Sequence, residues 1–201
     1  MKYDFIEIGT SDFDTLLQCA SNDMVGLSIE PLQLYLDKLP NKDNVKKVCA
    51  AVSDKEENMD LYYIEPELIE KYNFDSGMRG CNSLGAPHQS VIATLGEELY
   101  NKVATKLSVE CITWKTLIER YNVTGIDILK IDTEGHEEVV LGEYLKICMS
   151  NPELFADRII FEYNVLSNLN NLDALISKFE EYNYTLGYKG VKENAELVRN
   201  E

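Results

Sequence analysis

The chain has 201 residues, 45% of them hydrophobic, a composition typical of one globular domain with a sizeable core. Its 35 acidic and 19 basic residues give a formal net charge of -16. This charge argues against nucleic acids and anionic membranes as partners, since both need cationic protein surface. The sequence contains neither a signal-peptide pattern nor a membrane-length apolar run, which predicts a cytoplasmic protein without membrane insertion.

The five cysteines are widely spaced and include no C-x-x-C pair, so we expect reduced, mostly buried thiols rather than a zinc site or a redox couple. The first predicted strand begins near Tyr3, with no helix, cap or polar tail before it. Two explanations of this start stay open: a domain cut from a longer chain, or a naturally short chain.

Strand-like and helix-like segments alternate along the chain. The predicted strands are residues 3–8, 25–30, 45–52, 59–64, 107–112, 126–131, 158–163 and 184–189. The predicted helices are residues 12–20, 31–39, 66–72, 90–102, 113–121, 137–149 and 171–183. This order predicts a single α/β domain over residues 1–201, with a mostly parallel sheet and helices on both faces. Residues 74–89, rich in Gly, Ser, Asn and Pro, are expected to form an irregular loop near an active site.

Acidic residues close the first two predicted strands. Glu7 ends the first strand, and Gly9 follows in a tight turn that lets a ligand approach the backbone. Glu30 ends the second strand 21 positions after Gly9, about the spacing at which dinucleotide-binding folds place an acid on ribose hydroxyls. The alternative for Glu30 is a solvated acid at the start of the helix that Pro31 begins.

The third predicted strand leads into Ser53 and Asp54, which suit an adenine amino group but are also ordinary turn residues. Because parallel strands end at one edge of a sheet, the three strand ends together predict a carboxylate-rimmed pocket. Such a pocket fits a hydroxyl-bearing, cationic nucleoside.

The strongest signal is the run IDILKIDTEGHEEVVL at residues 126–141, where an apolar strand ends in Asp132, Glu134 and His136. His136 is the first candidate for a general base, and His88 in the irregular loop is the second. The alternative for His136 is a solvent-exposed histidine at a helix start. For His88, the absence of any role is the preferred interpretation. Asp132, Glu134 and His136 also suit Mg²⁺ or Mn²⁺, but their spacing is not diagnostic, and a metal is not favoured.

Four further side chains carry groups that bind hydroxyls: Arg79 and Asn82 in the irregular loop, and Glu162 and Asn164 after the strand at 158–163. They are candidates for the acceptor side of the pocket, together with His88 and Glu134. Residues of these types are also common in loops that have no binding role.

The chain resembles the FkbM family of S-adenosylmethionine-dependent methyltransferases over roughly residues 3–190. The resemblance lies in FIEIGTSDFDT, IEPLQLYLDKL, the VCAAVSD strand end, and ITWKTLIERYNVTGIDILKIDTEGHEEVVL followed by IIFEYN. LKIDTEGHE is the most specific of these elements. The resemblance implies a Rossmann-like class I methyltransferase domain with a seven-stranded, mostly parallel sheet, and S-adenosylmethionine as methyl donor.

The resemblance also implies roles for residues of this chain. Four would surround the methionine part of the cofactor: Glu7, Gly9, Ser11 and Asp12. Glu30 would bind its ribose, Ser53 and Asp54 would lie near adenine, and Asp132 would lie beside the sulfonium. The chain departs from the family where further glycine is usual and Ser11, Asp12 and Phe13 stand instead, which puts the methionine contacts in doubt.

The prediction is therefore an O-methyltransferase acting on a hydroxyl of a sugar or glycan, such as a deoxyhexose like rhamnose, with a fused or neighbouring glycosyltransferase module as a reasonable partner. An NAD(P)-dependent oxidoreductase is the first rival, although no G-x-G-x-x-G follows the first strand. A binding domain without catalysis is the second, and a metal-dependent hydrolase the third.

Overall fold

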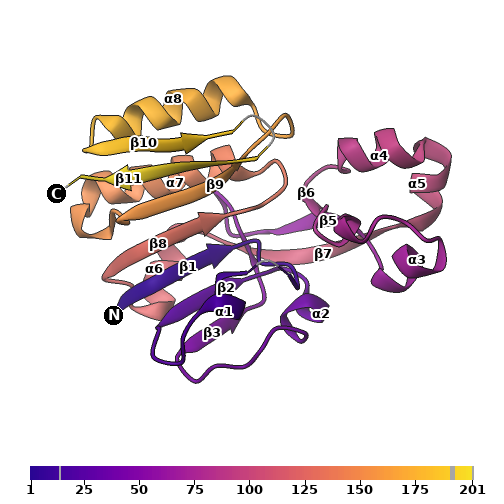
Figure 1. Cartoon of the computed structure of the whole chain (residues 1–201), viewed down its shortest axis with the longest axis horizontal. Coiled ribbons are helices and arrows are strands. Elements are labelled where there is room, and N and C mark those ends of the chain that lie inside the picture. The colour runs from indigo at the N-terminus through magenta and orange to yellow at the C-terminus, as the bar shows by residue number, and fades with distance from the viewer. Residues whose placement is uncertain (14, 191–192, 201) are drawn as a thin grey trace.

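A computed structural model describes residues 1–13, 15–190 and 193–200 (Figure 1). Its main sheet has seven strands in the order β10-β11-β9-β8-β1-β2-β3. Their bounds are β1 (Lys2–Ile8), β2 (Gly26–Ile29), β3 (Val45–Val48), β8 (Gly125–Ile131), β9 (Arg158–Tyr163), β10 (Tyr184–Lys189) and β11 (Glu193–Arg199).

The central strand of this sheet is β1, which pairs in parallel with β2 on one side and β8 on the other. Ile6 lies opposite Leu27 and Leu129 in the two registers. Strand β11 alone among the described strands of this sheet runs against its neighbours β9 and β10. The prediction of a seven-stranded, mostly parallel sheet in an α/β domain is confirmed.

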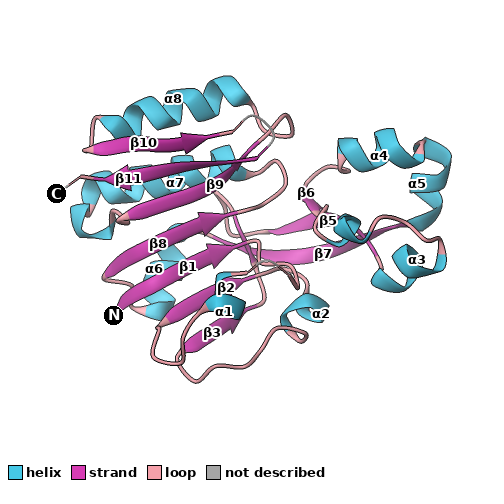
Figure 2. Ribbon diagram, in the orientation of Figure 1, coloured by secondary structure: helices cyan, strands magenta, loops and turns pink. Residues whose placement is uncertain are grey.

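Helices cover both faces of the main sheet (Figure 2). On one face, Phe5 of β1 packs with Leu17 of α1 (Leu16–Cys19) and Leu36 of α2 (Gln33–Leu36). On the other, Ile6 belongs to a large core with Leu117 and residues of three longer helices. These helices are α6 (Trp114–Tyr121), α7 (Glu137–Ser150) and α8 (Leu169–Glu180), and the short η2 (Pro152–Leu154) follows α7.

Residues 51–112 form a smaller, four-stranded sheet with its own helices, which we call the insert. Its strands, in the order β4-β7-β5-β6, are β4 (Ala51–Val52), β5 (Asn58–Ile64), β6 (Ser83–Leu84) and β7 (Ala104–Ile112). Its helices are α3 (Pro66–Lys71), η1 (Ser76–Arg79), α4 (Gln89–Leu95) and α5 (Glu97–Val103). The insert projects to the right of the main sheet in Figure 1 and has an apolar cluster of its own that includes Ile69 and Val103.

Several predicted boundaries are wrong for local reasons. The run 45–52 is two strands in different sheets, because the chain leaves β3 after Val48 and enters β4 at Ala51. The helix predicted at 90–102 is split at Gly96, whose φ of 79° is not helical. Helices α1 and α2 are shorter than the predicted ones, and residue 14, within the predicted helix 12–20, lies outside the described residues.

Strand β11 was not predicted, although Ala195 and Leu197 on it are fully buried. The irregular loop predicted at 74–89 contains η1 and β6. All five cysteines are free, but Cys111 and Cys148 are the two that are fully buried, fewer than expected. No helix in the described part of the chain is long and apolar enough to cross a membrane.

Candidate active site

A pocket of about 280 Å³ lies where the carboxyl ends of β1, β2 and β8 meet the insert. This size is near the lower end of the usual range for small-molecule sites, about 300–1,000 Å³. The main-sheet side contributes Ile8, Gly9, Thr10, Ser11, Phe13, Glu30, Pro31, Ala50, Asp132, Thr133, Glu134, His136 and Glu162. The insert contributes Ala51, Val52, Leu61, Gly77, Gly80, Asn82 and Leu84.

The turn after β1 is built for close backbone approach. Gly9 has a φ of 79°, and a Cβ on it would lie 1.7 Å from the backbone oxygen of Asp132. The Asp132 amide donates to the carbonyl of Ile8 at 2.9 Å, which joins the ends of β8 and β1. Glycine at position 9 is therefore required for the two strand ends to meet at the pocket.

Glu30 is 3% exposed and lines the pocket at the end of β2. Its two carboxylate oxygens accept hydrogen bonds from the backbone amides of Ser11, at 2.9 Å, and Leu32, at 3.0 Å. Burial raises the pKa of Glu30 to about 7. Each carboxylate oxygen has a second lone pair, so Glu30 keeps acceptor capacity for ligand hydroxyls.

Glu137 at the start of α7 organises the turn after β8, and the sequence analysis gave it no role. It is fully buried, and one carboxylate oxygen accepts from the amide of Thr133 at 2.7 Å and from its hydroxyl at 2.8 Å. The other accepts from the amide of Gly135 at 3.0 Å and from the hydroxyl of Ser167. The sequence feature that could have indicated this role is an acidic residue at the first position of the predicted helix. From there, five positions after Asp132, a side chain can accept hydrogen bonds from free amides at the helix start.

Three carboxylates from β8, its following turn and β9 converge in the pocket. Asp132, Glu134 and Glu162 each offer an oxygen, and these atoms lie within 4.8 Å of one another. Burial raises the pKa of Asp132 to about 6, an effect that Lys130 partly opposes. Burial and the neighbouring charge of Glu134 raise the pKa of Glu162 to about 9, so Glu162 is protonated at neutral pH. The predicted metal set contained His136, whereas this group contains Glu162 in its place.

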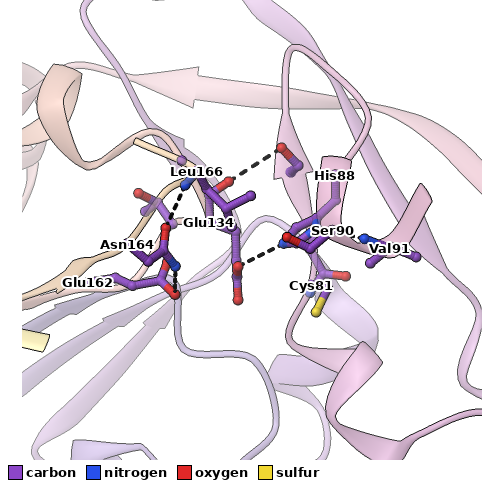
Figure 3. A network of polar contacts seen from close by, with 12 residues as sticks. Cys81, His88, Ser90, Val91, Glu134, Glu162, Asn164 and Leu166 are labelled. Carbon is purple, nitrogen blue, oxygen red and sulfur yellow. Dashed lines mark hydrogen bonds and ion pairs between the residues drawn. The ribbon is translucent and has the colours of Figure 1, made fainter. Parts of the chain in front are cut away.

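Asn164 supports the Glu162 side of this group. Its amide nitrogen donates to one carboxylate oxygen of Glu162, and its own side-chain oxygen accepts from the amide of Leu166 at 2.8 Å (Figure 3). The other oxygen of Glu162 is buried and has no hydrogen-bond partner among the described residues. Asn164 thus orients Glu162 rather than lining the pocket itself.

His88 joins the insert to the turn after β8. Its Nδ1 accepts from the amide of Val91 at 3.3 Å, so the ring proton is on Nε2, which lies 2.9 Å from a Glu134 carboxylate oxygen (Figure 3). Both ring nitrogens are therefore engaged within the protein. This arrangement leaves His88 no lone pair with which to act as a base, and it is not among the pocket residues. Cys81 offers a third ligand atom within 4.8 Å of this pair, and a metal on Nε2 would require the ring proton to leave that nitrogen.

His136 lines the pocket at the N-terminal end of α7. Its Nε2 lies 3.0 Å from the hydroxyl of Ser53, which also contacts Asp54 at 3.3 Å. Burial lowers the pKa of His136, so the ring is neutral at neutral pH, as a base requires. Ser53 is buried and Asp54 is exposed, and neither residue lines the pocket. The preceding residues Ala51 and Val52 line it instead.

Two acids predicted to face the cofactor instead form hydrogen bonds and ion pairs with other groups of the protein. Glu7 is fully buried and accepts from the amide of Leu16 at 3.0 Å and from Lys130 at 3.2 Å, and burial raises its pKa. Asp12, whose side chain is 2% exposed, forms ion pairs with Lys38 at 3.1 Å and Arg79 at 3.2 Å. Glu7, Asp12 and Arg79 are outside the pocket lining.

The charged groups that line the pocket are all acidic: they are the carboxyl groups of Glu30, Asp132, Glu134 and Glu162, and no lysine or arginine of the described chain lines it.

A model of the methyltransferase FkbM domain matches residues 6–186, nearly the whole chain. The chain belongs to the FkbM methyltransferase family. No curated protein and no solved structure matched it.

Membership in the FkbM family supports methyl transfer as the chemistry of this pocket, and it argues against the oxidoreductase alternative. The family match also covers the pocket residues from Ile8 to Glu162, so the domain and the site coincide.

Proposed function

We propose that this protein is an S-adenosylmethionine-dependent O-methyltransferase that acts on a hydroxyl of a sugar or glycan. The observation that carries the proposal is the pocket at the ends of β1, β2 and β8, lined by Gly9, Glu30 and Asp132. Ligands of open α/β sheets bind at this edge. The family match supplies methyl transfer as the reaction class.

The residues present fit the proposed cofactor. Gly9 lines the pocket at the point where the ends of β1 and β8 meet, and the buried Glu30 carboxylate suits the two hydroxyls of a ribose. The carboxylates of Asp132 and Glu134 create a negative field that favours a cation such as a sulfonium. S-Adenosylmethionine supplies the methyl group as an electrophile when bound. We favour methyl transfer without a metal ion, although the carboxylate oxygens of Asp132, Glu134 and Glu162 are ligands that suit Mg²⁺.

For the acceptor, the same wall offers hydrogen-bonding groups of both kinds. Glu134 accepts, Glu162 lines the pocket as a protonated carboxyl group, and Asn82 provides an amide. Sugar hydroxyls both donate and accept, whereas a phosphorylated acceptor would be repelled by these carboxylates. His136, neutral and held by Ser53, is placed to take the hydroxyl proton as the oxygen reacts.

Thermal unfolding with separate additions of S-adenosylhomocysteine, S-adenosylmethionine, NAD and NADP tests the cofactor. A ligand at 100 times its dissociation constant stabilises by about 2.7 kcal/mol. We expect a rise in Tm with the two adenosyl compounds alone, followed by methyl transfer from labelled cofactor to sugar acceptors. A rise with NAD or NADP would contradict the proposal, and no rise with any of them would favour a binding domain without catalysis.

A further inference from the structure

Two walls of the pocket come from different parts of the chain, and Arg79 contacts both of them. The first wall is the turn after β1, residues 9–13, which we call the first loop. The second is the η1 segment, residues 76–82, which lies in the insert and contributes Gly77, Gly80 and Asn82 to the pocket. Arg79 stands within the η1 segment, and its side chain is directed to the first loop.

Arg79 contacts the first loop in three ways. Its Nη1 lies 3.2 Å from the buried carboxylate of Asp12, and its guanidinium carbon is 5.0 Å from the ring centroid of Phe13. Its backbone oxygen accepts from the hydroxyl of Ser11 at 3.4 Å. Ion pairing with a buried carboxylate and stacking on an aromatic ring are the two contacts for which a guanidinium is best suited.

Arg79 also fixes the η1 segment internally. Its Nε donates to the backbone oxygen of Ser76 at 3.2 Å, and its backbone oxygen accepts from the side chain of Asn82 at 2.8 Å. Gly80 packs so closely on the first loop that a Cβ there would lie 3.1 Å from the Phe13 ring. The Arg79 side chain thus contacts both the η1 segment and the first loop. The Phe13 ring of the first loop, itself a pocket residue, packs against the η1 segment.

We propose that Arg79 is a positioning residue that clamps the η1 segment to the first loop and thereby controls how long a ligand stays in the pocket. Arg79 is outside the pocket lining and contacts the pocket residues Ser11, Phe13 and Asn82, so it acts through them and not on the ligand. The proposal rests on the proposed function only for the choice of ligand. It assigns Arg79 a role different from the acceptor contact that its residue type suggested.

Asp12 provides a matched control, because its carboxylate has a second ion-pair partner on the opposite side. Lys38, just beyond α2, lies 3.1 Å from the same oxygen and forms no hydrogen bond or ion pair with the described residues of the η1 segment. Lys38→Ala and Arg79→Ala therefore remove the same charge from the same carboxylate. They differ in whether the η1 segment is released.

Ligand kinetics form the first arm of the test, with S-adenosylhomocysteine as the probe and stopped-flow or surface-based detection. In Arg79→Ala we expect dissociation about tenfold faster with association changed less than about twofold, since loss of a closing contact acts on the off-rate. Lys38→Ala should match the wild type. Arg79→Lys, which keeps a charge near Asp12 but loses the stacking on Phe13, should be intermediate. Equal dissociation rates in Arg79→Ala and the wild type would overturn the proposal.

Hydrogen–deuterium exchange of the ligand-free protein forms the second arm and does not depend on the cofactor. Amides of residues 76–84 should exchange faster in Arg79→Ala than in the wild type and Lys38→Ala, while those of β1 and β8 stay protected. Unchanged exchange at 76–84 would overturn the clamp. If the wild type does not bind S-adenosylhomocysteine, the cofactor assignment fails and exchange alone decides the clamp. If Arg79→Ala does not fold, Arg79→Lys replaces it in both arms.

Discussion

At the scale of single residues, Glu30 combines burial with contact to the pocket, and both determine how it responds to pH. Burial raises its pKa to about 7, so its ionised fraction increases steeply between pH 6 and pH 8. A protonated carboxyl group gives up acceptor capacity to its own hydroxyl. We expect the affinity for S-adenosylhomocysteine to rise about tenfold over this interval, measured by calorimetry, since the ionised form is the one that accepts both ribose hydroxyls.

Glu30→Gln should weaken the same binding by about 1.5–3 kcal/mol at pH 8, the usual value of a hydrogen bond to a charged group. It should also flatten the pH dependence, because the titrating group is gone. Affinity that varies with pH in Glu30→Gln as it does in the wild type would assign the titration to another residue, with Asp132 the next candidate because its pKa is raised to about 6.

His136 is the residue whose loss should separate chemistry from binding. His136→Ala should slow methyl transfer by about 10²–10⁴-fold, the usual contribution of a general base, with little change in affinity for S-adenosylhomocysteine. Ser53→Ala should produce a smaller loss of rate, since Ser53 orients His136 through its hydroxyl without lining the pocket. Single-turnover rates measure both, and an unchanged rate in His136→Ala would exclude it as the base.

At the scale of elements, the connection from β8 to α7 depends on Glu137. Its carboxylate accepts from two amides and two hydroxyls, of Thr133, Gly135 and Ser167, in a fully buried position. Glu137→Ala leaves these donors without a partner, and we expect a loss of about 3 kcal/mol or more in the free energy of unfolding, measured with urea. Glu138→Ala is the matched control, since the carboxylate of Glu138 accepts a hydrogen bond from the exposed side chain of Asn171. Equal losses in both variants would contradict the role of Glu137.

The elements that the sequence predicts best are those whose signal is local. Strands β1 and β8 are rich in large apolar residues, and both were placed within about one residue because this local composition identifies a buried strand without knowledge of its partners. In the second sheet, β5 and β7 overlap predicted strands, whereas the two-residue strands β4 and β6 had no local signal. Strand β4 is two residues long and exists because Ala51 pairs with Cys111, far away in the sequence.

The same distinction separates the predicted site residues. Gly9, Glu30, Asp132 and His136 line the pocket because they follow strand ends, and the topology brings strand ends together. Glu7 lies near the end of β1 and Asp12 follows it, yet Glu7 forms an ion pair with Lys130 and Asp12 with Arg79, partners whose proximity depends on tertiary packing. Residue type and spacing therefore located the edge of the sheet that carries the site, whereas the direction of each side chain depended on contacts across the chain.

At the scale of the whole molecule, the buried acids of the pocket set how stability varies with pH. Folding raises the pKa of Glu162 from 4.5 to about 9, of Glu30 from 4.5 to about 7, and of Asp132 from 3.8 to about 6. The folded state therefore binds more protons than the unfolded state between about pH 4 and pH 9. By linkage, the free energy of unfolding decreases as pH rises through this window. We expect Tm to fall from pH 5.5 to pH 8.5.

Glu162→Gln should weaken this dependence, because the variant removes the group with the widest gap between its folded and unfolded pKa values. The variant and the wild type should have similar stability near pH 4, where Glu162 is largely protonated in both the folded and the unfolded state, and the variant should be more stable by at least about 1 kcal/mol at pH 8.5. Glu98→Gln makes the same change of charge on an exposed residue of α5.

The net charge of -16 also destabilises the folded state as more acids ionise, so the two contributions must be separated. Salt screens charges at the surface far more than charges that are partly buried. Glu98→Gln should therefore gain little stability at pH 8.5, and that gain should vanish in high salt, whereas the gain of Glu162→Gln should persist. Equal gains in the two variants, lost together in salt, would attribute the pH dependence to the overall charge and not to the carboxylates that line the pocket.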